Sequence, residues 1–455
     1  MLLAPLLDRL PGLACALDVD VVGDRIQRQL LCPDAQIDRI TTAKHWMSGD
    51  GTFALRYQLR ASLDGNDLGD LQVSGRVHQE TDSAEASVSD LDGRRTGPWR
   101  RSTAVLGEAQ LALAAFPVDP DLPTLSRAMD PDTLRGLAYS GRGDLQPAVE
   151  VAHRPREGAC VLRYRFARQD GRPTGRARRV LYGKVYADDR GQRVDGYLRS
   201  LERDRLASHS LRAARFPTSV AYLPDTRLLV TAELAGEARV PHLLNATLGS
   251  NGVAAAAAAE LRAAVRNAGR ALAALHSADV AEAPIHRPAD EVASLRRDLA
   301  AVEEVWPDVA ARVARALDPP SRTVPNVRRL VLSHGDFTPS QVLGLDGHAP
   351  AVLDLDTLRW ADPAEDLGRY LAHVALLAAK GGDPSPGDTL ERLAEELVGG
   401  YVEAAARPTA VPAPDRIAYY MSTTLARSAL NSCRQLKTQR LELALSLLEN
   451  TYARG

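Results

Sequence analysis

The chain has 455 residues, of which 45% are hydrophobic and 25% charged, and its formal net charge is -2. This composition is that of a folded globular protein, and the length predicts two or three domains. The nearly balanced charge gives no electrostatic reason to expect nucleic acid or an anionic membrane surface as a partner.

The cysteines and the apolar segments indicate the compartment. Cys15, Cys32, Cys160 and Cys433 are scattered, with no CxxC pair and no histidine cluster nearby. This pattern argues against a zinc site and favours reduced thiols, so we expect a cytoplasmic protein. No apolar run approaches the roughly 20 residues that span a bilayer. The start of the chain has no basic segment and reaches Asp8 early, which argues against a signal peptide.

The first half of the chain is rich in strand-like runs and contains two similar segments. Residues 51–57 (GTFALRY) resemble residues 158–164 (GACVLRY). Further along, 75–77 (GRV) resemble 183–185 (GKV), at offsets of 107 and 108 residues. The register is kept, so we interpret the pattern as the duplication of a three-stranded unit. Residues 113–138, between the copies, carry prolines and short helical segments and are predicted to pack on one of the sheets.

The second copy is predicted to be a β-meander followed by a helix and two more strands. Its strands are expected at 148–154, 159–167 and 180–188, its helix at 194–214, and the last two strands at 216–223 and 226–234. Lys184 lies in the third of these strands. Four of the 56 basic residues in the chain are lysines, so a lysine inside an apolar strand is unusual here.

The second half, from about Val253, has apolar residues at helical spacing. A long helix is expected at 253–278 and a helical hairpin around Pro307. Three further helical segments follow, at 366–380, 387–406 and 415–455.

A turn between two short apolar runs carries the most informative motif. His334-Gly335-Asp336 follows the first run, Gln341 comes five residues after the aspartate, and the second run ends in Asp354 and Asp356. Carboxylate and amide oxygens are the ligands that Mg²⁺ prefers. An aspartate on a tight turn after a strand is also a candidate general base.

With residues 361–367 (ADPAEDL), this order resembles the catalytic loop of the aminoglycoside phosphotransferase and choline kinase-like family, relatives of the protein kinases. In that family HGDxxxxN precedes a strand that ends in Asp, and GDPxxDL follows. The resemblance covers about residues 149–455. It implies an α+β, bilobal protein-kinase-like fold with an antiparallel β small lobe and a helical large lobe. The extra N-terminal α+β domain would then duplicate the small-lobe sheet.

The resemblance implies ATP- and Mg²⁺-dependent phosphoryl transfer to a hydroxyl of a sugar, aminosugar or aminoglycoside-like molecule. Asp336 would be the catalytic base, and His334 is grouped with it in the catalytic loop, where it more often holds the loop than carries a proton. Gln341 and Asp354 would hold Mg²⁺. Asp356 is either a further metal ligand or a solvated turn residue.

The nucleotide would be bound by residues of the small lobe and its connection to the large lobe. Lys184 would bind the α- and β-phosphates, and Glu202 on the following helix would brace it, although a solvated Glu202 is nearly as well supported. Glu233 and Leu234 resemble the inter-lobe segment that hydrogen-bonds adenine. Arg76, at the position of Lys184 in the first copy, is interpreted as part of the scaffold.

Two departures from the family pattern bear on activity. Gln341 replaces the usual Asn, as in maltokinase-like and aminosugar kinase-like members, and its extra methylene moves the amide outwards. The turn at 155–158 (PREG) has one glycine and gives no clear phosphate-binding loop. A catalytically weak nucleotide-binding scaffold, or a kinase-like enzyme that modifies a peptide, therefore remain alternatives.

Two acidic residues of the ADPAEDL motif have structural interpretations. Asp362 is predicted to cap a helix, with Pro363 at the first helical position and Glu365 completing a capping box. Asp366 is expected to steady the catalytic loop. We place the domains at 1–112, 113–148 (connector), 149–238 (small lobe) and 239–455 (large lobe). Residues 1–148 are the expected site of any partner or dimer contact.

Overall fold

The computed structural model describes the chain except for residues 1, 90, 92–96, 135–144, 157, 169–179, 208–209, 249–253, 323, 328, 345–347, 384–385, 406–410 and 454–455. It divides into two compact units. Unit 1 comprises residues 1–191, 221–230 and 433–436, and unit 2 comprises 192–220, 231–432 and 437–455. Among the described residues, none of the helices is both long and apolar enough to cross a membrane.

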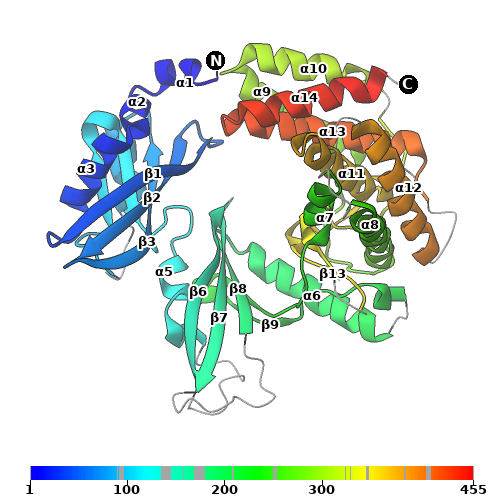
Figure 1. The fold of residues 1–455 in the computed structure, drawn as a ribbon, viewed down its shortest axis with the longest axis horizontal. Helices are drawn as coiled ribbons and strands as arrows, with labels where there is room; N and C mark the ends of the chain where they lie inside the picture. Colours follow the sequence, from blue (N-terminus) through cyan, green and yellow to red (C-terminus); the bar gives the residue numbers. More distant parts are fainter. Residues whose placement is uncertain are drawn as a thin grey trace. The chain divides into compact units, whose positions relative to one another are not determined.

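Unit 1 begins with three helices that lead into an antiparallel sheet (Figure 1). The helices are α1 (Ala4–Arg9), α2 (Leu13–Leu17) and α3 (Val19–Gln29). The Asp18 carboxylate caps α3 by accepting hydrogen bonds from the N–H groups of Asp20 and Val21. Gln27 on α3 then bonds to the backbone at Ala35 and Ile37, which fixes the helix against the first strand.

The first sheet has five strands in the order β1-β2-β3-β5-β4. They are β1 (Ala35–Met47), β2 (Phe53–Leu63), β3 (Asn66–Val77), β4 (Thr103–Leu106) and β5 (Leu111–Ala115). Helix α4 (Thr81–Ser89) follows β3, and its buried residues Ala84 and Val88 pack on Ala112 of β5. The short helices α5 (Leu125–Ala128) and η2 (Pro131–Leu134) come next.

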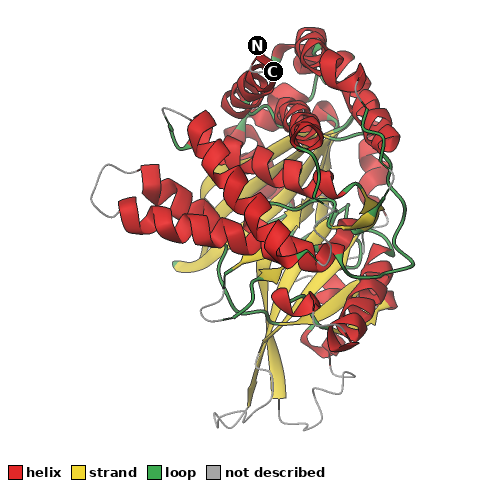
Figure 2. Ribbon diagram, turned by 90° about the vertical axis from the view of Figure 1, so that its right-hand side faces the viewer, coloured by secondary structure: helices red, strands yellow, loops and turns green. Residues whose placement is uncertain are grey.

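The second sheet repeats this order as β6-β7-β8-β10-β9. Its strands are β6 (Leu145–Arg156), β7 (Ala159–Arg168), β8 (Val180–Tyr186), β9 (Ser219–Leu223) and β10 (Leu228–Ala232). Helix α6 (Arg190–Ala207) follows β8 as α4 follows β3, and with 18 residues it is twice as long as α4. The two sheets, with the strands yellow in Figure 2, confirm that the N-terminal α+β domain duplicates the small-lobe sheet.

Side-chain packing explains why the two copies share a tyrosine on one strand and a glycine on the next. Tyr57 on β2 is buried and donates its hydroxyl to the carbonyl of Ala16, and Tyr164 on β7 donates to Ala128. A Cβ at Gly75 would lie 2.8 Å from the Tyr57 ring, and one at Gly183 would lie 2.6 Å from the Tyr164 ring. Each glycine therefore makes room for the tyrosine of the neighbouring strand.

The duplicated unit is larger than the three strands predicted from sequence. In each copy a hairpin closes the sheet around a short 3-10 helix, η1 (Gly107–Ala109) or η5 (Pro224–Thr226). Both 3-10 helices end in a left-handed residue, Gln110 at φ 48° and Arg227 at φ 49°. The two hairpins share only scattered residues, such as Leu106 with Leu223 and Leu111 with Leu228, so the duplication of these strands was not predicted from the sequence.

Some expected boundaries differ from those observed. Strand β5 passes the expected end of the first domain at residue 112, and β6 begins within the segment 113–148 that we predicted as a connector. The helix expected at 194–214 ends at Ala207 and is followed by η4 (Ser210–Ala213). Glu157 of the PREG turn lies outside the described residues.

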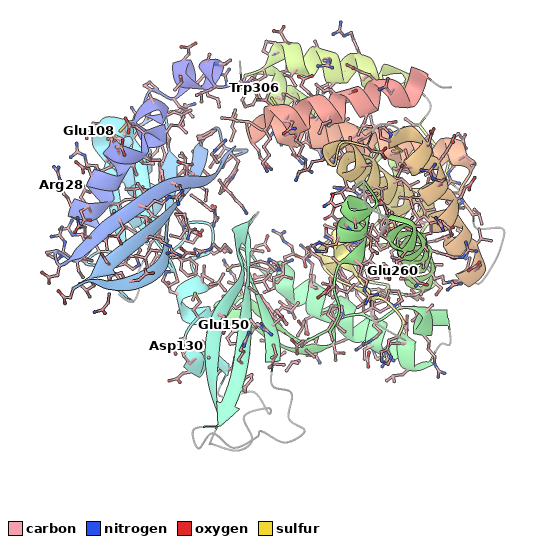
Figure 3. All side chains as sticks on the ribbon, in the orientation of Figure 1. Arg28, Glu108, Asp130, Glu150, Glu260 and Trp306 are labelled. Carbon is pink, nitrogen blue, oxygen red and sulfur yellow. The ribbon has the colours of Figure 1, made fainter. Side chains whose placement is uncertain are left out.

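Unit 2 is mainly helical, which confirms the α+β class (Figure 1). Besides most of α6, its helices are α7 (Arg239–Leu248), α8 (Ala254–His276), α9 (Pro288–Glu303), α10 (Pro307–Arg322), α11 (Pro363–Lys380), α12 (Pro386–Ala404), α13 (Pro414–Arg434) and α14 (Thr438–Ala453). The hairpin of α9 and α10 is as predicted, with buried Trp306 between the two helices (Figure 3). Exposed charges such as Glu260 on α8 lie on the outer faces.

Short strands between α10 and α11 carry the acidic motif. They are β11 (Val331–Ser333), β12 (Val342–Leu343), β13 (Ala351–Val352) and β14 (Arg359–Ala361), with 3-10 helices η6 (Pro339–Gln341) and η7 (Leu355–Thr357). Strand β11 pairs antiparallel with β14, and β12 with β13. Helices α8 and α11 contact β11, and α7 and α11 contact η6, so the motif is held by the helical core of unit 2.

Candidate active site

The His-Gly-Asp turn leaves β11 in a conformation that requires glycine. Gly335 has a φ of 77°, and a Cβ there would lie 2.4 Å from the carbonyl oxygen of Thr357. A side chain is therefore excluded both by the left-handed backbone and by the close approach of another segment. The turn carries Asp336 out of the core, and its side chain is 45% exposed.

Asp366 on α11 holds the backbone of this turn, as predicted. Its fully buried carboxylate accepts hydrogen bonds from the N–H groups of His334 (2.7 Å) and Gly335 (2.9 Å). His276 donates a third bond through Nε2 at 3.1 Å, and its Nδ1 is paired with Tyr401. Burial raises the pKa of Asp366, but the hydrogen bond from His276 and the other donors outweigh it and lower the pKa to about 2.

His334 joins the turn to the strand that precedes Asp354. Its buried ring donates from Nε2 to the carbonyl oxygen of Leu353 at 2.8 Å, and its Nδ1 accepts from the N–H of Asp336 at 3.3 Å. Both ring nitrogens are thus used, in the neutral tautomer with the proton on Nε2. These contacts favour the loop-holding role for His334 over proton transfer.

Asp336, Gln341 and Asp354 lie together. The Gln341 Nε2 is 3.2 Å from Asp336 Oδ2 and 3.5 Å from Asp354 Oδ2. The backbone supports this arrangement, since the N–H of Leu353 donates to the carbonyl of Gln341 at 2.9 Å. Asp354 is left-handed, with φ and ψ both 61°, a conformation that is uncommon outside glycine and that recurs at functional sites.

This group fits a hard divalent cation. Its donors are two carboxylates and an amide, and the buried Gln341 Oε1 has no hydrogen-bond partner among the described residues. The nitrogen and oxygen of an amide exchange places by a half-turn of the side chain, which would present Oε1 to a cation beside Asp354. Asp356 lies on η7, two residues after Asp354, and its role as a ligand stays a prediction.

The predicted nucleotide-binding residues lie on expected elements. Lys184 is on β8, with its Nζ 5.5 Å from the centre of the Tyr186 ring. Glu202 is on α6, where its carboxylate accepts two hydrogen bonds of 3.0 Å from Arg205. Lys184 belongs to unit 1, whereas Glu202 and Asp336 belong to unit 2. Whether Lys184 meets either of them therefore stays a prediction.

Glu233 and Leu234 follow β10 directly, at the start of the segment that leads to α7. A little further on, Glu237 and Gly344 exchange two backbone hydrogen bonds, of 2.9 and 3.3 Å. Gly344 comes directly after β12. The segment that we predicted to bind adenine is thereby attached to the strand that follows Gln341.

A network of arginines and carboxylates lies beside Asp336 and was not predicted from the sequence. Arg369 on α11 places Nη1 3.6 Å from Asp336 Oδ1 and Nη2 3.7 Å from Glu365 Oε1. Arg359 on β14 forms a close ion pair with the same Glu365. Asp362 caps α11 as predicted, but Glu365 pairs with these arginines and does not supply the second half of a capping box. The spacing of residues 362, 365, 366 and 369 on one helix was the available signal.

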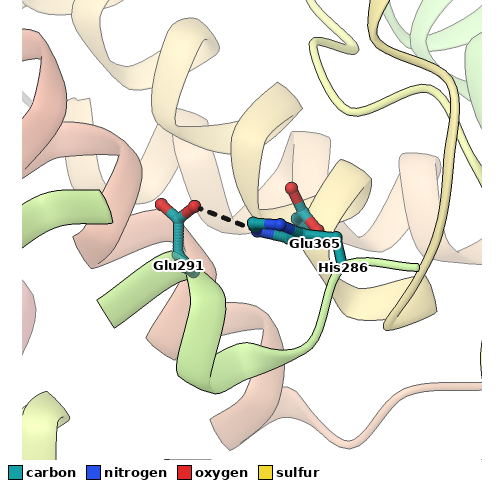
Figure 4. A group of neighbouring side chains, drawn as sticks. All are labelled: His286, Glu291 and Glu365. Atoms are coloured by element: carbon teal, nitrogen blue, oxygen red, sulfur yellow. Dashed lines mark ion pairs between the residues drawn. The ribbon is translucent and has the colours of Figure 1, made fainter. Parts of the chain in front are cut away.

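His286, Glu291 and Glu365 form a cluster whose ligand atoms all lie within 4.8 Å of one another (Figure 4). His286 Nε2 is 3.4 Å from Glu291 Oε2. Arg427 binds Glu291 at 2.9 Å, while Arg359 binds Glu365. Burial raises the pKa of Glu291, but His286 and Arg427 lower it further than burial raises it. The carboxylates already have cationic partners, so we interpret the cluster as an ion-pair network.

Residues 193–418 match the model of the phosphotransferase enzyme family. The curated proteins give no match. Similar solved structures include a macrolide 2'-phosphotransferase from Brachybacterium faecium (19% identity, TM-score 0.42, 70% of this chain and 97% of that one). A choline/ethanolamine kinase family protein from Mesorhizobium loti (16%, 0.42, 67% and 87%) and a choline kinase from Cryptosporidium parvum (9%, 0.48, 69% and 90%) are also similar.

Proposed function

Because residues 193–418 belong to the phosphotransferase enzyme family, we propose that this small-molecule phosphotransferase moves the γ-phosphoryl group of ATP to a hydroxyl of a sugar, aminosugar or aminoglycoside-like acceptor. The observation that carries the proposal is the convergence of Asp336, Gln341 and Asp354 at one exposed turn, held by Asp366. Phosphoryl transfer needs these parts: a base for the hydroxyl proton, ligands for a metal, and a rigid support.

Asp336 is the catalytic base. Its carboxylate is half-exposed on a turn whose backbone is fixed by Asp366, so an acceptor hydroxyl can approach it while the carboxylate stays in place. The base accepts the hydroxyl proton as the oxygen forms its bond to phosphorus and the bond to the leaving β-phosphate oxygen breaks.

Gln341 and Asp354 would hold Mg²⁺ through the amide and carboxylate oxygens, and Asp356 is the nearest further oxygen donor along the chain. Bound there, the ion would neutralise charge on the phosphates. Lys184 would contact the α- and β-phosphates, with Glu202 as its brace. The backbone at Glu233 and Leu234 would hydrogen-bond the adenine. These four residues complete the nucleotide site that we propose.

The test is a screen of the purified chain with Mg-ATP and Mg-GTP against neutral sugars, aminosugars and aminoglycosides, with the nucleoside diphosphate and the phosphorylated product measured separately. Asp336→Ala should lower kcat by about 10²- to 10⁴-fold and leave nucleotide binding unchanged. Asp308→Ala, on the exposed start of α10, is the matched control and should keep full activity.

Three outcomes would contradict parts of the proposal. Equal turnover by Asp336→Ala would remove the base assignment. Binding of Mg-ATP without any product across the panel would favour the nucleotide-binding scaffold. A lack of binding would refute both. The free state of all four cysteines is in keeping with a proposed cytoplasmic location. Any partner or dimer contact is proposed to involve residues 1–148.

A further inference from the structure

We propose that Arg369 is a positioning residue for the catalytic base, because its guanidinium faces Oδ1 of Asp336. The inference rests on the proposed function, which assigns Asp336 the role of base. Arg369 lies on α11, three residues after Asp366. One helix would thus fix the backbone of the catalytic turn through Asp366 and the side chain of the base through Arg369.

The contact acts through charge. Arg369 Nη1 is 3.6 Å from Asp336 Oδ1 and Nη2 is 3.7 Å from Glu365 Oε1, both longer than a hydrogen bond. Arg369 is only 9% exposed, so the attraction is less screened than that of a surface pair. A fixed guanidinium beside Oδ1 therefore favours one orientation of the Asp336 carboxylate.

Arg369 is not required to neutralise Glu365. The buried Glu365 already has a close partner in Arg359, whose Nη2 also lies 3.4 Å from the carbonyl oxygen of Gly335. The other buried carboxylates nearby also have cationic or hydrogen-bonding partners: Asp362 pairs with Arg416, Glu291 with Arg427 and Asp366 with His276. The partner that distinguishes Arg369 is therefore Asp336.

These side chains form a continuous series of contacts that starts and ends in the catalytic turn. It runs from Gly335 through Arg359, Glu365 and Arg369 to Asp336. Because Gly335 and Asp336 are consecutive, both ends of this chain of contacts lie in the same turn. Rotation of the Asp336 carboxylate would have to break its charge contact with Arg369. Such support from surrounding residues is what keeps a reacting group within the narrow range of productive geometry.

The first test separates kcat from KM. Arg369→Gln removes the charge at similar length and should lower kcat about tenfold or more, with KM for ATP changed less than about threefold. Arg369→Lys keeps the charge and should restore most of kcat. Arg312→Gln is the matched control, because Arg312 also binds two carboxylates, Glu442 and Glu449, away from the turn. A kcat for Arg369→Gln equal to that of the control would overturn the proposal.

The second test does not need turnover. His373, one helical turn after Arg369, has a pKa lowered to about 4 by burial and by the charges of Arg369 and of Arg440 on α14, whereas the charge of Asp336 raises it. NMR titration of the histidine ring should show a higher pKa of His373 in Arg369→Gln and a lower one in Asp336→Asn. If the wild type turns over no acceptor, the proposed function fails, while these shifts would still support the pairing. An unchanged titration of His373 in Arg369→Gln would refute the pairing, whatever the activity.

Discussion

Replacing Asp366 by Asn tests whether a single buried charge holds the catalytic turn. The carboxylate is fully buried and accepts three hydrogen bonds, from His276 and from the backbone of His334 and Gly335. Asparagine has nearly the same shape, but it has one acceptor oxygen, and its NH₂ group would face one of these donors. The variant should fold with a displaced turn and lose most of its phosphotransferase activity.

The expected loss of folding free energy in Asp366→Asn follows from the lowered pKa of Asp366 and from the hydrogen bond that asparagine cannot accept. The pKa of Asp366 falls from 3.8 to about 2, because the donors that surround it outweigh burial. This difference corresponds to about 2 kcal/mol of folding free energy at neutral pH. A buried donor without a partner costs about 1–3 kcal/mol more. The total of about 3–5 kcal/mol is a large part of the roughly 5–15 kcal/mol that stabilises a typical domain.

Urea unfolding of the wild type and of Asp366→Asn at several pH values measures this difference in the free energy of unfolding. The pKa of the folded state lies below that of the unfolded state, so the ionised carboxylate stabilises the fold fully above about pH 5 and less as the pH falls towards 2. The deficit of Asp366→Asn should therefore shrink by about 1 kcal/mol between pH 5 and pH 3. Asp308→Asn, an exposed substitution, should show a small deficit at every pH. A deficit for Asp366→Asn that is below 1 kcal/mol at neutral pH, or that does not vary with pH, would refute the reasoning.

Three further predictions concern the same site. Gly335→Ala should abolish turnover and lower the free energy of unfolding by about 1–3 kcal/mol, because its Cβ would lie 2.4 Å from the Thr357 oxygen; a fully active variant would show that the turn can relax. Gln341→Ala should raise the Mg²⁺ concentration needed for half-maximal rate about tenfold or more, measured by metal titration, and an unchanged requirement would exclude Gln341 as a ligand. Lys184→Met should raise KM for ATP and lower kcat in steady-state assays while unfolding is unaffected, and unchanged kinetics would place the phosphates elsewhere.

Much of the fold could be predicted because its signals are local. The alternation of apolar residues predicted β7 and β8, and the helical spacing predicted α8 and the hairpin of α9 and α10. The duplication was visible where packing requires the same residue types in both copies, as at Tyr57 with Gly75 and Tyr164 with Gly183. Strands β9 and β10 were predicted as well, whereas β4 and β5 were not. The duplication was recognised for three strands only, because the residues that the two hairpins share are few and scattered.

The candidate site also has one part that the sequence could predict and one part that it could not. Asp336, Gln341 and Asp354 are close along the chain, and one turn and one hairpin bring them together, so their order predicted their proximity. Arg369 and Glu365 were missed because their significance depends on which face of α11 packs on the turn.

The order of residues in this chain by itself determined the turn, its acids and the α+β plan, because short apolar runs and a glycine specify strands and a reversal wherever they occur. Tertiary packing alone decided which charges meet. Residue 369 lies 33 positions after the base along the chain, and such a contact depends on how a helix docks, which no sequence spacing records. Docking buries these charges, and burial is what gives a guanidinium beside a carboxylate its influence on orientation.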